Sequence, residues 1–152
     1  MRPRSPKSPT KTPAVHYLRV GPLPVHVGVA VDQQSYAREL KRLGMVAPAL
    51  HAYVSRGAAA TTTLLDNDED TPILIIGLNF EKIIHLDQLV GVIAHELAHV
   101  WQYVLDIIGE AKASEELEAY YLQYWMQQII TIVYPKSISI KVHPPSNPRR
   151  RR

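Results

Sequence analysis

The pattern of apolar and polar positions predicts three strands. Alternating valines predict a strand over residues 23–30. The run TTTLL at 61–65 predicts a second strand, and the continuous apolar run ILIIGLN at 73–79 predicts a third, buried in the centre of a sheet. An acidic segment, DNDED, and then Thr71 and Pro72 lie between the last two. That segment is typical of a turn, so we expect these two strands to pair antiparallel.

Helical spacing and capping residues predict two helices upstream of residue 110. Asp32 can cap a helix through QQSYARELKRL that ends at Gly44. A longer helix is expected to begin with Asp87 as its N-cap and to end at Gly109. Its apolar positions recur at helical spacing: Leu89, Val92, Ile93, Leu97, Val100, Trp101, Val104 and Leu105.

A third helix is expected from about Ser114, as N-cap, to Ile130, because Pro135 prevents it from going much further. Only about five residues separate it from the long helix, so the two are expected to be antiparallel neighbours. Trp101 and Trp125 are expected in their core. The element order predicts an α+β domain in which a small, mainly antiparallel sheet packs on these two C-terminal helices.

Composition permits one ordinary domain. The chain has 152 residues, of which 46% are hydrophobic and 20% charged, which is typical of a globular protein. It contains no cysteine, so a metal ion would have to be held by histidine and carboxylate side chains. No apolar stretch is long enough to span a bilayer, and the first residues lack the apolar core of a secretory signal. We therefore expect a protein without membrane contact, located in a cytoplasm or in a particle assembled there.

The charge is unevenly distributed. Residues 1–13 and 143–152 each carry four basic residues and no acidic one, whereas the rest of the chain carries nine basic and fourteen acidic residues. The sequence thus predicts a single domain over 14–142 with two basic, proline-rich tails. Such tails either contact nucleic acid or acidic neighbours, or serve only as solubilising ends.

One motif carries candidate chemistry: His95-Glu96-Leu97-Ala98-His99, inside the long helix. Residues four apart lie on one face of a helix, so His95 and His99 can share one Zn²⁺ ion. Glu96 is turned about 100° around the axis, where it can accept a proton from a zinc-activated water that attacks a carbonyl. The alternative is that both histidines are partly buried and bonded to backbone or water, with Glu96 a surface charge.

A catalytic zinc usually has a third protein ligand. The helix that follows opens with three carboxylates, Glu115, Glu116 and Glu118. Acidic residues at a helix N-terminus are also favoured by the helix dipole alone. Spacing alone does not choose among the three.

HELAHVWQ followed by a helix containing E-L-E-A resembles the gluzincin zinc metallopeptidases, over about Leu86 to Gln128. In several branches of that family the first Glu of an E-x-x-A pattern is a zinc ligand. The resemblance therefore implies a minimal zincin-like domain in which Glu116 is the third ligand. Glu118 is the alternative, because in some relatives the ligand directly precedes Ala.

More narrowly, the arrangement of these motifs resembles small phage-encoded HExxH peptidases. They share a valine-rich start, an R-E-L-x-R-L helix and an HExxHxxQ…GE…SxExEAY pattern, and some are virion components. The resemblance implies peptide-bond hydrolysis in a bacteriophage context, with a protein or peptide as substrate.

Four polar residues near the motif are further candidates. Gln102 would either bond a group next to the zinc ligands or be polar filler. The hydroxyl of Tyr120 or Tyr124 could stabilise an oxyanion, although simple aromatic packing is the blander interpretation. Glu110 could orient a ligand imidazole through the free N–H of the ring, but we expect it to be a helix-end charge. The remaining histidines are expected to be non-ligands: His16, His26, His51, His85 and His143.

Two functions are therefore open. The first is a zinc-dependent metallopeptidase in which Glu96 is the general base. The second is a virion structural or assembly protein with a structural or vestigial zinc site, whose basic tails contact DNA or neighbouring subunits. A catalytic site keeps a position open for water, whereas a structural site closes it with a fourth protein ligand.

Overall fold

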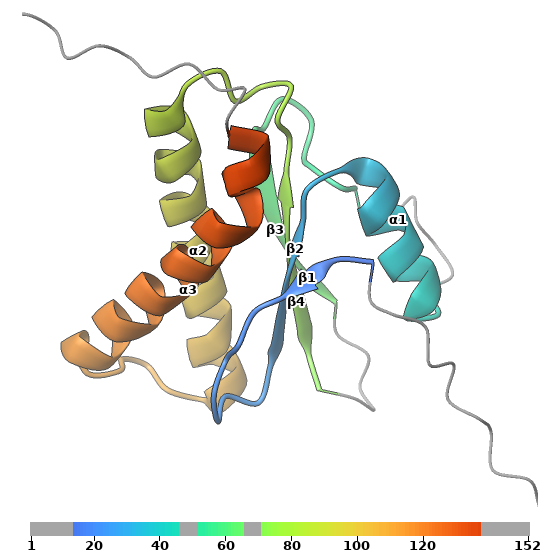
Figure 1. The fold of residues 1–152 in the computed structure, drawn as a ribbon. Coiled ribbons are helices and arrows are strands. Elements are labelled where there is room, and N and C mark those ends of the chain that lie inside the picture. Colours follow the sequence, from blue (N-terminus) through green and yellow to red (C-terminus); the bar gives the residue numbers. More distant parts are fainter. Residues whose placement is uncertain (1–13, 46–51, 66–70, 138–152) are drawn as a thin grey trace, which may run out of the picture.

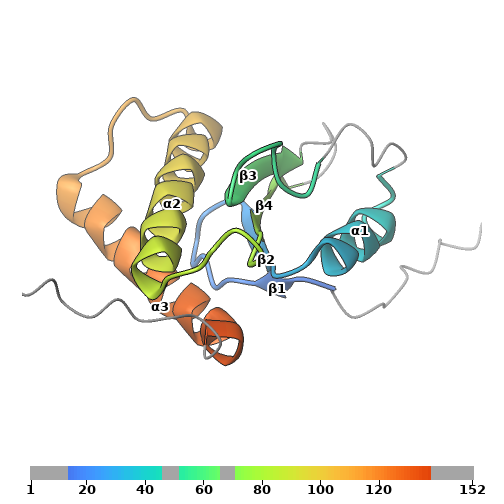
Figure 2. The same cartoon turned by 90° about the horizontal axis from the view of Figure 1, so that it is seen from above.

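The computed structural model describes residues 14–45, 52–65 and 71–137. Within these residues three helices enclose a four-stranded sheet from two sides (Figure 1). Helix α1 covers one face of the sheet, and helices α2 and α3 cover the other (Figure 2). The elements in chain order are β1 (His16–Tyr17), β2 (His26–Ala30), α1 (Gln33–Arg42), β3 (Ala60–Leu65), β4 (Ile73–Leu78), α2 (Leu86–Ile108) and α3 (Glu115–Ser137).

The sheet has the strand order β1-β2-β4-β3. Strands β3 and β4 pair antiparallel, with Thr62 opposite Ile76, which confirms the predicted pair. Strands β2 and β4 pair in parallel, and β1, which the pattern did not predict, pairs antiparallel with β2. The α+β class is confirmed. The sheet is mixed, because a connection that contains α1 and β3 brings β2 and β4 together in the same direction.

The core lies on both faces of the sheet, which explains the continuous apolar run of β4. Leu74, Ile76 and Leu78 face the α2 and α3 layer, whereas Ile75 packs in the cluster beneath α1. When both faces of a strand are covered, none of its side chains faces solvent, so apolar and polar residues need not alternate along it. The predicted central strand is therefore confirmed as β4.

Helix α1 has the predicted ends. The Asp32 carboxylate accepts a hydrogen bond of 2.7 Å from the Ser35 amide, and Gly44 adopts a left-handed φ of 73° just beyond the helix. Glu39 of this helix is fully buried. Its carboxylate accepts hydrogen bonds from the Arg42 guanidinium, the Tyr17 hydroxyl and the Ala14 amide, so it ties α1 to the start of β1.

Helix α2 begins two residues earlier than expected. Its N-cap is His85 rather than Asp87, which lies inside the first turn, and the first helical bond runs from the Leu89 amide to the His85 carbonyl. A carboxylate inside the first turn still faces the positive end of the helix dipole, so Asp87 has a favourable position without capping. Gly109, with a φ of 72°, ends the helix as predicted.

Helix α3 is capped by Ser114 as expected, since the Ser114 hydroxyl accepts a bond from the Leu117 amide at 3.2 Å. It continues to Ser137, so the expected end near Ile130 is wrong. Pro135 stands inside its last turn, where a proline removes one helical hydrogen bond but does not prevent two further helical residues.

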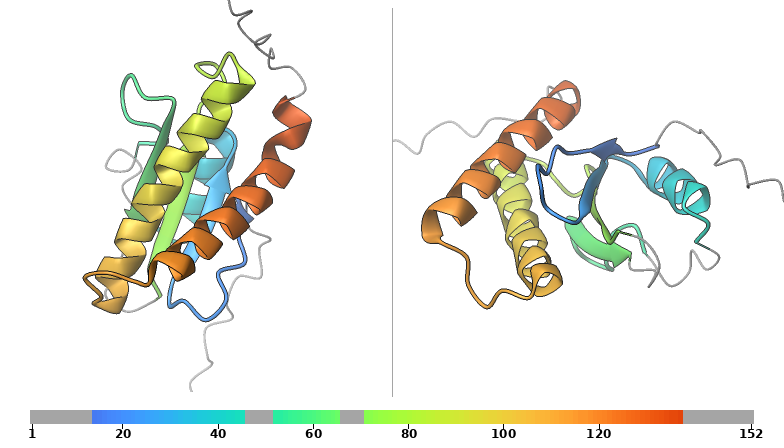
Figure 3. Two further views of the ribbon diagram at one scale, coloured as in Figure 1. Left: turned by 90° about the vertical axis from the view of Figure 1, so that its left-hand side faces the viewer. Right: turned by 90° about the horizontal axis from the view of Figure 1, so that it is seen from below.

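Helices α2 and α3 run antiparallel, as predicted, and cross at an angle (Figure 3). The Trp101 ring stacks on Tyr121, with centroids 5.6 Å apart, and also contacts Trp125. Both tryptophans are buried, which confirms their expected place in the core. These contacts fix which part of α3 lies beside the middle of α2.

None of the helices in the described part of the chain is long and apolar enough to cross a membrane. The predicted basic tails, 1–13 and 143–152, lie outside the described residues.

Candidate functional site

The two histidines of the motif point their Nε2 atoms at each other. His95 and His99 lie one turn apart on α2, with the Nε2 atoms 3.1 Å apart and the rings nearly perpendicular at 83°. Two imidazole nitrogens bound to one tetrahedral zinc at ~2.0–2.1 Å would be about 3.3 Å apart. The distance between the two Nε2 atoms is therefore close to that between two ligands of one ion. Without an ion the same distance suits an N–H···N hydrogen bond.

Gln102 lies within hydrogen-bond distance of the His99 ring. Its side-chain oxygen lies 3.2 Å from His99 Nδ1, one turn further along α2. An Nδ1–H that donates to this oxygen leaves the Nε2 lone pair of the same ring free to bind a metal. Of the two interpretations of Gln102, the structure therefore favours a bonding role over polar filler, because its side chain contacts the His99 ring.

Glu96 is buried in contact with the sheet, unlike the exposed histidines. It is 5% exposed, and its Oε2 accepts a hydrogen bond of 2.7 Å from the Thr62 hydroxyl. Thr62 is on β3, where alternation turns Ala60, Thr62 and Leu64 towards α2. Because the bond fixes one carboxylate oxygen, Glu96 is held in one orientation beside the histidine pair.

These residues line one hollow of about 280 Å³ between β3 and α2. Helix α2 contributes His95, Glu96, His99 and Tyr103 to its lining, and the remaining lining residues are Ser55, Ala58, Ala60, Thr61 and Thr62. Thr62 and Tyr103 were not identified from the sequence. Tyr103 is four residues beyond His99, a spacing that predicts the same helix face. No sequence signal links Thr62 to a motif 34 residues away.

The structure does not bring Glu116 or Glu118 to the histidine pair. No group of three His, Cys, Asp or Glu side chains suited to a metal ion is found among the described residues. Residues two apart on a helix point about 200° apart, so Trp101, which packs on α3, and His99 are on opposite sides of α2. The carboxylates at the start of α3 therefore belong to the other side of the long helix.

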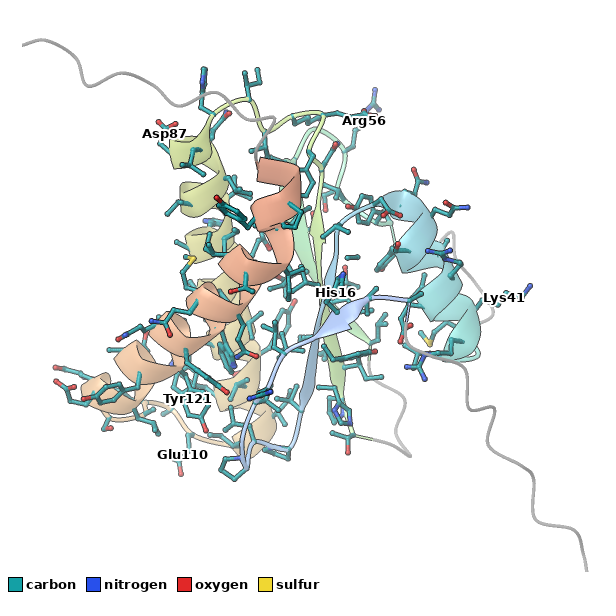
Figure 4. The ribbon with its side chains drawn as sticks, in the orientation of Figure 1. His16, Lys41, Arg56, Asp87, Glu110 and Tyr121 are labelled. Atoms are coloured by element: carbon teal, nitrogen blue, oxygen red, sulfur yellow. The ribbon has the colours of Figure 1, made fainter. Side chains whose placement is uncertain are left out.

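The other candidates are also separate from the hollow. Tyr120 is 67% exposed and Tyr124 is 42% exposed, both on α3. Glu110 is exposed just past the end of α2; Figure 4 labels it there, with Asp87 at the opposite end of that helix. Its amide bonds the Leu105 carbonyl, as expected of a helix-end residue.

The remaining histidines do not join the pair where the structure describes them. His16 and His26 are on β1 and β2, and His85 caps α2. His51 and His143 lie outside the described residues.

Comparison of the chain with models of known families, with curated proteins and with solved structures gave no match.

Proposed function

We propose that this protein is a zinc-dependent hydrolase of peptide bonds, with His95 and His99 as metal ligands and Glu96 as general base. The observation that carries the proposal is the convergence of the two Nε2 atoms, 3.1 Å apart, beside a buried carboxylate in one hollow. Burying a carboxylate costs free energy unless the carboxylate has a hydrogen-bond partner. The Thr62 hydroxyl is this partner for Glu96, and the bond also holds the carboxylate in the hollow that the two histidines line.

Zinc bound at the two imidazoles would polarise a carbonyl and lower the pKa of a water molecule. The protein side chains would divide the other work. Glu96 accepts the proton of the attacking water and returns it to the leaving amine. Gln102 keeps the His99 ring in the orientation that presents Nε2, and Tyr103 offers a phenol to the oxyanion from the wall of the hollow.

A peptide substrate suits the position of the hollow next to β3. This strand is at the end of the sheet order, and its outer edge has no strand partner among the described residues. An extended peptide can add to such an edge through main-chain hydrogen bonds. A peptide bond placed in this way would lie beside the carboxylate that Thr62 orients.

A structural zinc site in a virion protein is less well supported by the same geometry. A closed site needs four protein ligands, and a chain without cysteine must supply them as histidine or carboxylate. The described residues gather two imidazoles and one adjacent carboxylate that is hydrogen-bonded to Thr62. A catalytic site keeps one position for water, so it needs fewer protein ligands beyond these side chains than a closed structural site does.

The experiment is a hydrolysis assay on the full chain loaded with zinc, using a quenched fluorescent peptide library, with Glu96→Gln as the test variant. Glutamine keeps the size and the bond to Thr62 but cannot accept the proton. We expect the variant to retain zinc and to lose at least about a hundredfold in kcat/KM.

Glu110→Gln is the matched control, since Glu110 is an exposed glutamate of the same helix region outside the hollow. We expect wild-type activity from it. Equal activity of wild type and Glu96→Gln, or no cleavage of any library peptide by zinc-loaded wild type, would refute the proposal.

A further inference from the structure

Helix α3 exposes a continuous stripe of uncharged side chains on the side away from the core. We call it the outer stripe; it consists of Leu117, Tyr120, Tyr124, Gln127, Thr131 and Tyr134. Its large members are well exposed, with Tyr120 at 67%, Tyr134 at 64% and Leu117 at 47%. Its residues alternate three and four apart, which is the spacing of a helix seam that packs on another helix.

The opposite side of the same helix packs in the hydrophobic core. Trp125, Ile129 and Val133 are buried against α2 and the sheet. A surface helix normally has one apolar side and one charged side, whereas α3 has no charged residue between Glu118 and Lys136. The outer stripe is therefore more apolar than folding of a single chain requires.

We propose that the outer stripe of α3 is a self-association surface, on which the same stripe of a second copy of this chain packs antiparallel. A two-fold symmetric contact uses one patch on both copies, and an uncharged seam on a single long helix meets that condition. This proposal does not depend on the proposed hydrolase function.

Charge favours the antiparallel orientation and a copy of the same chain. Helix α3 starts with Glu115, Glu116 and Glu118, and its only basic residue, Lys136, is in the last turn at the other end. Antiparallel packing brings the acidic end of one helix next to the basic end of the other, and it opposes the two helix dipoles favourably. Parallel packing would instead place six glutamates together.

A groove beside the outer stripe offers room for a side chain of the second copy. It has a volume of about 690 Å³ and lies between β1 and α3, with Tyr124, Gln128 and Thr131 on its α3 side. In the antiparallel seam Leu117 meets Tyr134, Tyr120 meets Thr131, and Tyr124 meets Gln127 of the other copy. The Tyr120 ring of each copy would then enter the groove next to Thr131 of the other.

The size of the stripe predicts a weak dimer. At 150–250 Å² for a fully exposed aromatic side chain, the three tyrosines offer roughly 350 Å² per copy, whereas a standard interface buries about 800 Å² per partner. Other stripe residues and the groove add to this area. We therefore expect association at protein concentrations of roughly 10–100 μM rather than at nanomolar concentrations.

Sedimentation equilibrium of the full chain between about 1 and 300 μM tests the surface. We expect wild type to pass from monomer to dimer over this range and the double variant Tyr120→Glu and Tyr124→Glu to remain monomeric. Ile84→Glu is the matched control, because Ile84 is an equally exposed apolar residue, at 57%, outside the stripe. A monomeric wild type, or a dimer that the double variant leaves intact, would overturn the proposal.

The orientation can be tested by cross-linking, because the chain has no cysteine of its own. Leu117→Cys and Tyr134→Cys are made separately and oxidised alone and as a mixture. We expect covalent dimers only in the mixture, since antiparallel packing brings position 117 of one copy to position 134 of the other. A dimer of Leu117→Cys alone would mean parallel packing and would overturn the proposed arrangement.

Discussion

At the scale of single residues, the buried carboxylate of Glu96 is explained by a strand that is distant in sequence. The motif alone indicated that His95, Glu96 and His99 serve one site. Only the fold shows that the Thr62 hydroxyl bonds the carboxylate at 2.7 Å, because β3 pairs with β4 in a register that turns Thr62 towards α2. In the proposed mechanism Thr62 is therefore a positioning residue, which acts through Glu96.

Replacing Thr62 separates this role from a merely structural one. Thr62→Val keeps the shape but removes the hydroxyl, so we expect kcat to fall roughly 10- to 100-fold while KM and zinc affinity stay unchanged. Thr62→Ser restores the hydroxyl and should recover most of the rate. Steady-state kinetics on the three proteins measure this. If the serine and valine variants behave alike, the hydrogen bond has no part in orienting the base.

At the scale of elements, Tyr53 makes two close contacts with the central strands of the sheet. Tyr53 crosses the ends of β2 and β4, where its hydroxyl donates to the Ala30 and Leu78 carbonyls, and burial raises its pKa to about 12. Gly77 of β4 lies against the backbone and the ring of Tyr53. A Cβ at Gly77 would be 2.2 Å from the Tyr53 carbonyl oxygen, whereas a Cβ at Gly91 of α2 would meet nothing within 4 Å.

The two glycines therefore predict opposite effects of alanine. We expect Gly77→Ala to lower the free energy of unfolding by about 1–3 kcal/mol, because the backbone of Tyr53 must move. We expect Gly91→Ala to raise it by about 0.5–1 kcal/mol, because alanine favours the helix and finds open space. Urea unfolding followed by circular dichroism measures both. A stabilising Gly77→Ala would show that Tyr53 does not pack on β4 in this way.

The buried Glu39 that links α1 to β1 should make stability depend on pH. Burial alone would raise the pKa of Glu39, but the bonds from Arg42, the Ala14 amide and Tyr17 hold it below its ordinary value. Its stabilising contribution is then present above the pKa of the unfolded state and is lost as pH falls through the lower pKa of the folded state. Stability should therefore decline below pH ~4.5.

Glu39→Gln tests this link. We expect it to cost about 3 kcal/mol at neutral pH, because it leaves the partly buried Arg42 without its carboxylate, and to flatten the decline at acid pH. Glu115→Gln is the matched control, since the ion pair of Glu115 with Lys112 is solvent-exposed and should contribute under about 0.5 kcal/mol. Thermal unfolding from pH 3 to 7 measures both variants. Equal losses would contradict the assigned role of Glu39.

At the scale of the whole molecule, local signals predicted elements better than they predicted their arrangement. Period and capping residues identified β3, β4 and the ends of α1, because these features depend on neighbouring residues. The parallel pairing of β2 with β4 depends on a long connection, and the pattern contains no signal for it. The two residues of β1 are too few for a period to be recognised.

The candidate site was likewise predictable only where it depends on residues that are neighbours in sequence. The four-residue spacing of His95 and His99 is a local property, and the structure places the two rings together. Which face of α2 receives α3 depends instead on the contact of Trp101 with Tyr121 and Trp125. That contact turns Glu116 away from the pair, so a spacing argument for a third ligand on α3 could not anticipate it.

The central claim is that His95 and His99 are metal ligands, and zinc titration of the full chain tests it most directly. We expect wild type to bind one zinc ion per chain and His99→Ala to bind it roughly tenfold or more weakly. Because Glu116 and Glu118 lie away from the pair, Glu116→Gln and Glu118→Gln should match wild type. No zinc binding by wild type, or an affinity that His99→Ala leaves unchanged, would contradict the account.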